Sequence, residues 1–125
     1  MIEVSKAKGS YIYDHKNKRY LDFVAGVSAC SVGHCNKEVI NAIKDQSEMY
    51  MHVMVYGEFV TKPSLELAKL LAKNLPNSLN CTYFTNSGTE ALEGSMKLAR
   101  RFTGRKKIIA AKNAYHGSTM GALTL

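Results

Sequence analysis

The sequence lacks several features that mark whole classes of protein. It has no tryptophan and only two prolines in 125 residues. No run approaches the 18 uninterrupted apolar residues of a membrane-spanning helix, and the N-terminus lacks the apolar core of a signal peptide. With 46% hydrophobic residues and no long run of charge, the chain is expected to be globular rather than disordered. The sequence therefore predicts a cytoplasmic protein with no membrane partner.

Disulfide, metal and nucleic-acid patterns are also missing. The cysteines, Cys30, Cys35 and Cys81, are odd in number and form no C-x-x-C, which favours free thiols in a reducing compartment. The four histidines form neither an i, i+4 pair nor H-E-x-x-H, so no metal site is predicted. The net charge is +7, but the basic residues are spread along the chain, with short clusters only at 16–19 and 105–107. Distributed charge is typical of a solvated surface, and no nucleic-acid partner is predicted.

The sequence does contain one stretch, residues 81–121, in which chemically useful residue types follow one another in order. Apolar residues predict strands at 81–85 and 108–111. A helix is predicted between them, and Gly104 is predicted to end it. The helix carries an apolar stripe at helical spacing, made of Leu92, Met96, Ala99 and Phe102.

The predicted helix opens on Ser87-Gly88-Thr89-Glu90, which has the S-x-x-E spacing of a capping box. In such a box Ser87 accepts from the Glu90 N–H while the Glu90 side chain reaches back. The N–H groups of Gly88 and Thr89 are then free at the positive end of the helix dipole, where an oxyanion such as phosphate can bind. Capping boxes are common, so the four residues taken alone favour a well-capped helix that binds nothing.

Tyr115 and His116 lie on the loop after the second predicted strand, where ligands of open α/β sheets bind. Tyr115 could cover a flat ring by stacking, and His116 could hydrogen-bond to it. Packing of the aromatic ring over a sheet edge is the other interpretation of this pair.

The stretch FTNSGTEALEGSMKLAR, followed by TGR and AYHGSTMGAL, resembles the phosphate-and-ring half of the class III pyridoxal-phosphate aminotransferases. This group includes acetylornithine, ornithine and 4-aminobutyrate aminotransferases. In that family the glycine and threonine of SGTEA bind the cofactor phosphate, and the aromatic residue before His-Gly stacks on the pyridine ring. The resemblance therefore implies a pyridoxal 5'-phosphate site at Gly88, Thr89 and Tyr115, with Ser87 as a helper and His116 as a neighbour.

The N-terminal half fits the same family. Residues 10–23 predict a hairpin with Asn17 in a left-handed turn, where the family usually has glycine. The small-residue stretch VAGVSACSVGHCNKEV is by itself a flexible loop. The resemblance implies that this loop lines the substrate entrance near a dimer partner, which places three residues close to substrate: Val27, Ser28 and Ala29. Helices are predicted at 37–49, with Asn36 as the N-cap, and at 63–74.

The fold class implied by the resemblance is α/β, the N-terminal part of the fold type I transferase fold. Its sheet is expected to be incomplete, because the family places strands from later in the sequence between 81–85 and 108–111. Residues 1–60 form an N-terminal segment of hairpin, entrance loop and helix, and residues 61–125 begin the large cofactor-binding domain. In the family, the Schiff-base lysine and the aspartate at the ring nitrogen lie well beyond YHG. We therefore expect an N-terminal fragment that carries no catalytic residue, is inactive alone, and folds poorly or pairs its strand edges abnormally.

The function implied is transfer of an amino group from an amino acid, including ω-amino donors, to a 2-oxo acid, by a homodimer. Two alternatives stay open. One is a non-catalytic phosphate-binding or interaction module. The other is a mutase, decarboxylase or racemase of the same fold, because residues that hold the cofactor do not choose the reaction.

Overall fold

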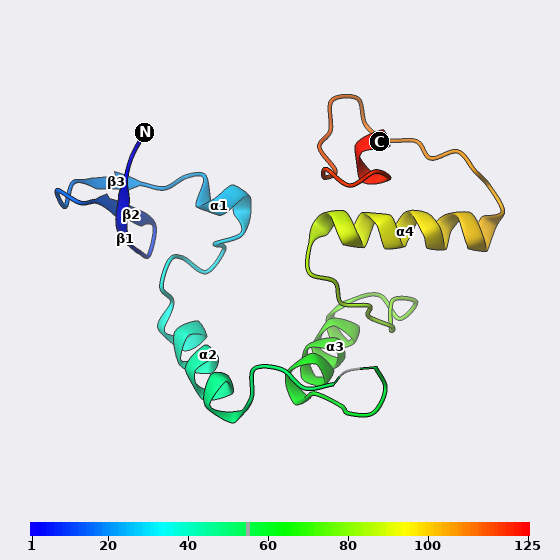
Figure 1. The fold of residues 1–125 in the computed structure, drawn as a ribbon, viewed down its shortest axis with the longest axis horizontal. Coiled ribbons are helices and arrows are strands. Elements are labelled where there is room, and N and C mark those ends of the chain that lie inside the picture. Colours follow the sequence, from blue (N-terminus) through cyan, green and yellow to red (C-terminus); the bar gives the residue numbers. More distant parts are fainter. Residues whose placement is uncertain (55) are drawn as a thin grey trace. The chain divides into compact units, whose positions relative to one another are not determined.

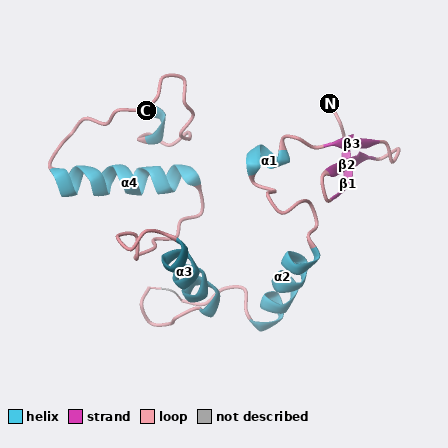
Figure 2. Ribbon diagram, turned by 180° about the vertical axis from the view of Figure 1, so that it is seen from behind, coloured by secondary structure: helices cyan, strands magenta, loops and turns pink. Residues whose placement is uncertain are grey.

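The structure is a computed structural model that describes residues 1–54 and 56–125. It divides into two compact units, Met1–Phe59 and Val60–Leu125. The first unit contains the only sheet in the described residues, and the second contains the longest helix, which borders the candidate site (Figures 1 and 2).

The sheet of the first unit has three antiparallel strands in the order β1-β2-β3. They are β1 (Val4–Lys8), β2 (Tyr11–Asp14) and β3 (Arg19–Leu21). Tyr11 pairs with Leu21 and Tyr13 with Arg19, so the predicted hairpin is confirmed, and β1 adds a strand that the sequence analysis did not predict.

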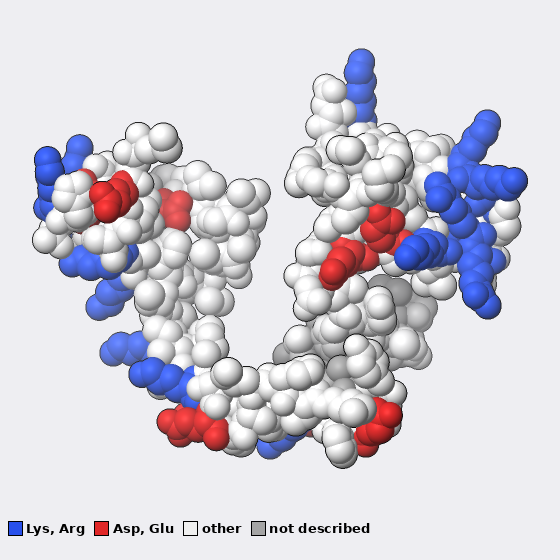
Figure 3. Space-filling view, in the orientation of Figure 1, with Lys and Arg blue, Asp and Glu red and all other residues white. Residues whose placement is uncertain are grey.

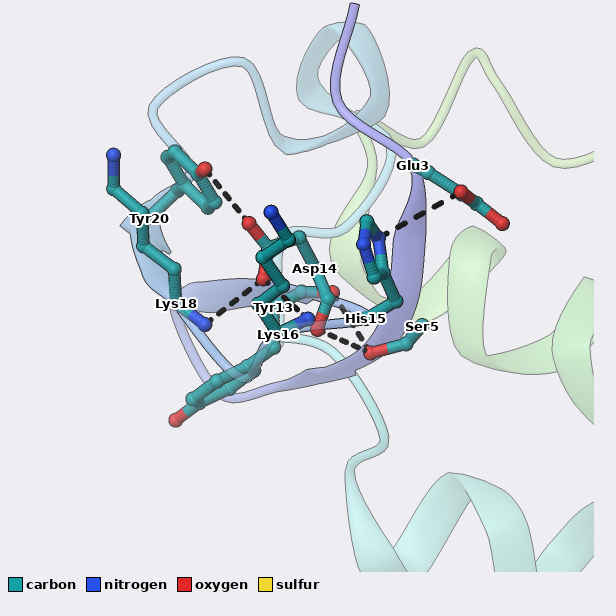
Figure 4. A network of polar contacts seen from close by, with 8 residues as sticks. All are labelled: Glu3, Ser5, Tyr13, Asp14, His15, Lys16, Lys18 and Tyr20. Carbon is teal, nitrogen blue, oxygen red and sulfur yellow. Dashed lines mark hydrogen bonds and ion pairs between the residues drawn. The ribbon is translucent and has the colours of Figure 1, made fainter.

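Asp14 fixes the turn of the hairpin (Figure 4). One carboxylate oxygen accepts from the N–H groups of Lys16 and Lys18, both at 2.9 Å, and the other accepts from the Tyr20 hydroxyl at 3.0 Å. Partial burial raises the pKa of Asp14, but these hydrogen bonds outweigh it and hold the pKa below its ordinary value. Asn17 has a φ of 60°, which confirms the predicted left-handed residue.

Two helices match their predicted positions closely. In α2 (Lys37–Met49), the Asn36 side chain accepts from the N–H groups of Glu38 and Val39, so the predicted N-cap is confirmed. In α3 (Lys62–Asn74), Thr61 is the N-cap residue but its side chain makes no capping bond to the backbone. Pro63 lies in the first turn of α3, where a missing N–H costs nothing.

The helix that organises the second unit is α4 (Gly88–Thr103), followed by Gly104 at a φ of 70°, the predicted left-handed stop. The predicted apolar stripe is confirmed only in part. Met96 is 6% exposed, whereas Phe102 is 87% exposed. Ala122, in the short 3₁₀ helix η1 (Ala122–Thr124), is the other buried apolar residue in the described chain. α4 is therefore covered only as far as Met96, and its last seven residues are exposed.

The strands predicted at 81–85 and 108–111 are not present as hydrogen-bonded strands. The residue types there favour strand, but a strand exists only when a neighbour pairs with it. No described residue pairs with either segment, and Ile109 is 99% exposed. The two predicted strands are therefore not formed in this chain, and its described second unit contains no sheet.

No helix in the described residues is long and apolar enough to cross a membrane. Basic side chains gather where α4 ends (Figure 3), with Arg100 and Arg101 in its last turn, at the negative end of the helix dipole.

Candidate functional site

The N-terminus of α4 has the hydrogen bonds of a capping box. The Ser87 hydroxyl accepts from the Glu90 N–H at 3.2 Å. The Glu90 carboxylate accepts from the Asn86 N–H at 2.8 Å, one residue earlier than the N-cap. Since the Ser87 oxygen acts as an acceptor, its own hydroxyl hydrogen can be donated to a further acceptor.

The cap leaves two donors unused at the end of the helix. In the described part of the chain, the N–H groups of Gly88 and Thr89 donate no hydrogen bond. A Cβ at Gly88 would meet nothing within 4 Å, so the backbone there is open to a bulky group. Two free amides at the positive end of a four-turn helix are the elements of an anion site.

These amides border an open cavity of about 740 Å³ in the second unit. One wall is the first turns of α4 and the other is the loop from Tyr115 to Thr119. All five residues predicted to bind the cofactor line it: Ser87, Gly88, Thr89, Tyr115 and His116. The structure therefore brings together two groups of residues that lie 26 to 29 positions apart in the sequence.

The loop wall presents two ring side chains. Tyr115 is 83% exposed, and its hydroxyl lies 3.3 Å from the Ser118 hydroxyl. His116 Nε2 is enclosed and has no hydrogen-bond partner among the described residues. A buried ring nitrogen without a partner is costly, so this nitrogen is an unsatisfied polar atom of the wall.

Glu93, one turn after Glu90 on α4, holds the two walls together. Its Oε1 atom accepts from the Thr119 hydroxyl at 2.7 Å, the Gly121 N–H at 2.7 Å and the Ala122 N–H at 3.1 Å. The hydrogen bond from Thr119, followed by that from Gly121, lowers the pKa of Glu93 below its ordinary value. Glu93 is therefore a carboxylate at neutral pH.

This carboxylate decides which way the Thr89 hydroxyl points its hydrogen. Thr119 donates its only hydroxyl hydrogen to Glu93, so toward Thr89, at 2.8 Å, it can only accept. Thr89 therefore donates to Thr119 rather than into the cavity. The donors that face the cavity at this position are backbone amides.

Sequence reasoning did not find Glu93, Thr119 or the role of Gly117. A Cβ at Gly117 would lie 2.2 Å from Thr89 Oγ1, so the loop approaches α4 closely only because residue 117 is glycine. The available signal for Glu93 was weak. It lies three residues before the buried Met96, at the edge of the apolar stripe, where a charged side chain is unusual unless it has a partner.

The residues predicted to lie near substrate, Val27, Ser28 and Ala29, are in the first unit. Val27 and Ser28 belong to α1 (Ala25–Ser28), a short turn in which all four residues have φ between 48° and 68°. Val27 is 86% exposed. A turn of left-handed residues, only one of them glycine, is strained, by about 1 kcal/mol or more at each other residue.

Asp22 and His34 fasten this turn. Asp22 Oδ1 accepts from the N–H groups of Val24 and Ala25, and Oδ2 lies 2.6 Å from His34 Nε2. The His34 hydrogen bond, followed by that from Ala25, lowers the pKa of Asp22. His34 is itself tied to Gly9 by a pair of backbone hydrogen bonds. The loop is therefore ordered rather than flexible.

A family model described as aminotransferase class-III matches residues 1–125, the whole chain. A curated relative, the acetylornithine aminotransferase of Archaeoglobus fulgidus, is 40% identical over 124 residues. The match covers 99% of this chain and 32% of that protein.

Two solved structures are similar in fold. One is a thermostable (S)-enantioselective ω-transaminase from Thermomicrobium roseum, with a TM-score of 0.89 and 33% identity over 99% of this chain and 29% of that one. The other is a taurine:2-oxoglutarate aminotransferase from Bifidobacterium kashiwanohense, in complex with PLP and glutamate, with a TM-score of 0.83 and 34% identity. The match covers 98% of this chain and 27% of that one. The chain spans about a third of the length of the proteins that it matches.

Proposed function

We propose that the whole protein is a pyridoxal-phosphate-dependent aminotransferase, starting from the fact that this chain belongs to the class-III aminotransferase family. The fold implied by the resemblance is confirmed by the similarity to solved transaminases over 99% of the chain. Transfer of an amino group from an amino acid, including ω-amino donors, to a 2-oxo acid is the activity that we propose for it.

The observation that carries the proposal is the cavity between the N-terminus of α4 and the Tyr115–Thr119 loop. A phosphorylated aromatic cofactor needs donors for a dianion at one end and a flat surface for a ring at the other. The free amides of Gly88 and Thr89 fit the first need, and the exposed ring of Tyr115 fits the second. His116, which also lines the cavity, lies beside the residue that would cover the ring. These residues fit pyridoxal phosphate.

We assign the residues to three tasks. The Gly88 and Thr89 amides bind the phosphate, with the Ser87 hydroxyl hydrogen as a third donor. Tyr115 covers the ring, and the close-packed loop keeps water from that face. Val27, Ser28 and Ala29 are proposed to lie near substrate, held in place by the fastened turn. When bound, the cofactor supplies an electron sink for chemistry at the carbon that bears the amino group.

Partners and setting are proposals of the same kind. The homodimer follows from the family resemblance. The cytoplasm is supported by three free cysteines, Cys30, Cys35 and Cys81, which suit a reducing compartment. The division into an N-terminal segment of residues 1–60 and a cofactor domain that begins at 61 is proposed on the resemblance as well.

Replacement of Gly88 by proline tests the phosphate assignment. Gly88 is the first residue of α4, where proline keeps the helix but removes the N–H, and the extended Ser87 is compatible with a following proline. In the protein expressed from its complete reading frame, Gly88→Pro is expected to weaken binding of pyridoxal phosphate by about tenfold, the effect of one lost hydrogen bond to a charged group.

The matched control is Lys37→Pro, at the first residue of α2, where the N-cap Asn36 has a compatible ψ of 127°. This control is expected to leave cofactor affinity unchanged. Equal affinity in Gly88→Pro and the unaltered protein would remove the phosphate assignment. Cofactor binding without amino-group transfer from any amino acid to a 2-oxo acid, measured by chromatography, would favour another reaction of the same fold. A protein that binds phosphate but not the cofactor would be the non-catalytic module.

A further inference from the structure

Glu93 is the one acidic side chain at the candidate site that the roles above leave unassigned. It is half-buried on the second turn of α4, and its Oε1 atom receives three hydrogen bonds from the loop that forms the opposite wall of the cavity. No other side chain among the described residues joins α4 to this loop by as many bonds.

The bonds converge on a short piece of the loop. Thr119 is the last loop residue that lines the cavity, and Gly121 and Ala122 follow it after one intervening residue, Met120. Ala122 is buried, and a Cβ at Gly121 would lie 2.3 Å from Glu93 Oε2. The carboxylate therefore lies against the loop backbone with no space between them, and glycine at 121 is what permits this.

The same contact reaches the phosphate wall. Thr119 Oγ1 lies 2.8 Å from Thr89 Oγ1, so one hydroxyl connects the Glu93 carboxylate to the second residue of the helix. Gly117, which is buried and has a φ of 118°, also lies against Thr89. Both walls are thus fixed relative to each other through Glu93 and Thr119.

We propose that Glu93 is a positioning residue that sets the spacing between the phosphate wall and the ring wall of the cofactor cavity. This inference rests on the proposed function, since it assigns the two walls to the two ends of one ligand. A ligand that contacts both walls binds tightly only when the walls lie at the right distance from each other. Inorganic phosphate contacts only the amides at the N-terminus of α4, so its affinity does not depend on that distance.

Two probes separate these cases in the protein expressed from its complete reading frame. Pyridoxine 5'-phosphate has the ring and the phosphate but no aldehyde, so its affinity reports non-covalent holding alone. Inorganic phosphate is measured as its competitor. In Glu93→Ala, the affinity for pyridoxine 5'-phosphate is expected to fall by about tenfold or more, the usual scale for losing a residue that orients direct ligands. The affinity for inorganic phosphate is expected to change by less than about twofold.

Glu93→Gln is the conservative variant. Its amide oxygen can still accept from Thr119 and the two backbone N–H groups, so it is expected to recover most of the affinity that alanine loses. Glu66, an exposed carboxylate on α3 that forms an ion pair with Lys69, provides the control for the change in charge, and Glu66→Gln is expected to match the unaltered protein.

Amide hydrogen exchange without any ligand tests the contact independently of the cofactor. Gly121 and Ala122 donate to Glu93, so Glu93→Ala is expected to lose protection at both amides. Unchanged protection in Glu93→Ala would overturn the inference about Glu93, whether or not the protein binds the cofactor. Failure of the unaltered protein to bind the cofactor would instead count against the proposed function. An equal fall in affinity for pyridoxine 5'-phosphate and for inorganic phosphate would also overturn the inference, because it would show a general structural role for Glu93. Unchanged affinity for both would overturn it as well.

Discussion

Gly117→Ala is the substitution whose effect the structure determines most sharply. The added Cβ would lie 2.2 Å from Thr89 Oγ1 and 2.4 Å from Thr89 Cβ, where ordinary contact begins at 3.4 Å. Thr89 cannot move aside, because its Cβ is fixed to the first turn of α4. The loop must therefore retreat by about 1 Å, the amount by which the contact falls short.

The cost has two parts. Gly117 has a φ of 118°, a conformation that costs a residue with a Cβ about 1–2 kcal/mol. Overpacking of a close contact adds about 1–3 kcal/mol. The total of about 2–5 kcal/mol acts on a loop held mainly by the hydrogen bonds to Glu93, so we expect the loop to leave α4 rather than to be compressed against it.

The assay is equilibrium binding of pyridoxine 5'-phosphate to the protein expressed from its complete reading frame. If the loop lies away from α4 in most molecules, the apparent affinity falls in proportion to the remaining fraction with the loop in place, by about tenfold or more. Two other glycines on the same elements serve as comparisons. Gly94→Ala places its Cβ 4.0 Å from the Tyr83 ring and should leave binding unchanged. Gly121→Ala places its Cβ 2.3 Å from Glu93 Oε2, so it displaces the carboxylate that holds the loop and should weaken binding as well. Affinity in Gly117→Ala equal to that of the unaltered protein would refute the close approach of loop and helix.

Three further predictions concern caps and carboxylates. Asn36→Ala removes two capping bonds and should lower the free energy of unfolding, measured in guanidinium, by about 1 kcal/mol. Thr61→Ala removes no capping bond to the backbone and should leave the free energy of unfolding nearly unchanged. Equal losses of stability in the two variants would contradict the capping geometry. Asp22→Ala removes the acceptor of the Ala25 N–H and should loosen the left-handed turn, seen as faster hydrogen exchange at Ala25; unchanged exchange would show that the turn does not depend on this side chain. Glu93 has a lowered pKa in the folded protein, so its contribution to stability is present above the ordinary glutamate pKa and is lost as the pH falls through the lowered value. Protection of the amides that it binds should therefore weaken as the carboxylate is protonated, and protection that stays the same from neutral pH into the acid range would show that the charge of Glu93 does not help to hold the loop.

Elements whose signals are local were predictable from the sequence. The ends of α2 follow from Asn36 and from the break in the apolar pattern after Met49, and the end of α4 follows from Gly104. Asn17 was identified because asparagine tolerates positive φ. These rules depend only on neighbours within a few residues, which a single sequence contains.

What the sequence could not predict depends on distant partners. Residues 81–85 and 108–111 have strand-forming side chains, but pairing decides whether strands form, and no described residue pairs with them. The left-handed turn at Ala25–Ser28 needs Asp22 and His34 to hold it, and nothing in VAGVS indicates the hand of the turn. The five predicted cofactor residues do line one cavity, while the carboxylate that joins its walls was missed because helical periodicity reports faces and not contacts.

The most direct measurement is an experimental structure of the protein expressed from its complete reading frame, crystallised with pyridoxal phosphate. We predict phosphate oxygens within about 2.7–3.2 Å of the Gly88 and Thr89 amide nitrogens, with the cofactor ring against Tyr115. A phosphate bound away from the N-terminus of α4, or a ring that does not contact the Tyr115–Thr119 loop, would contradict the assignment of this cavity.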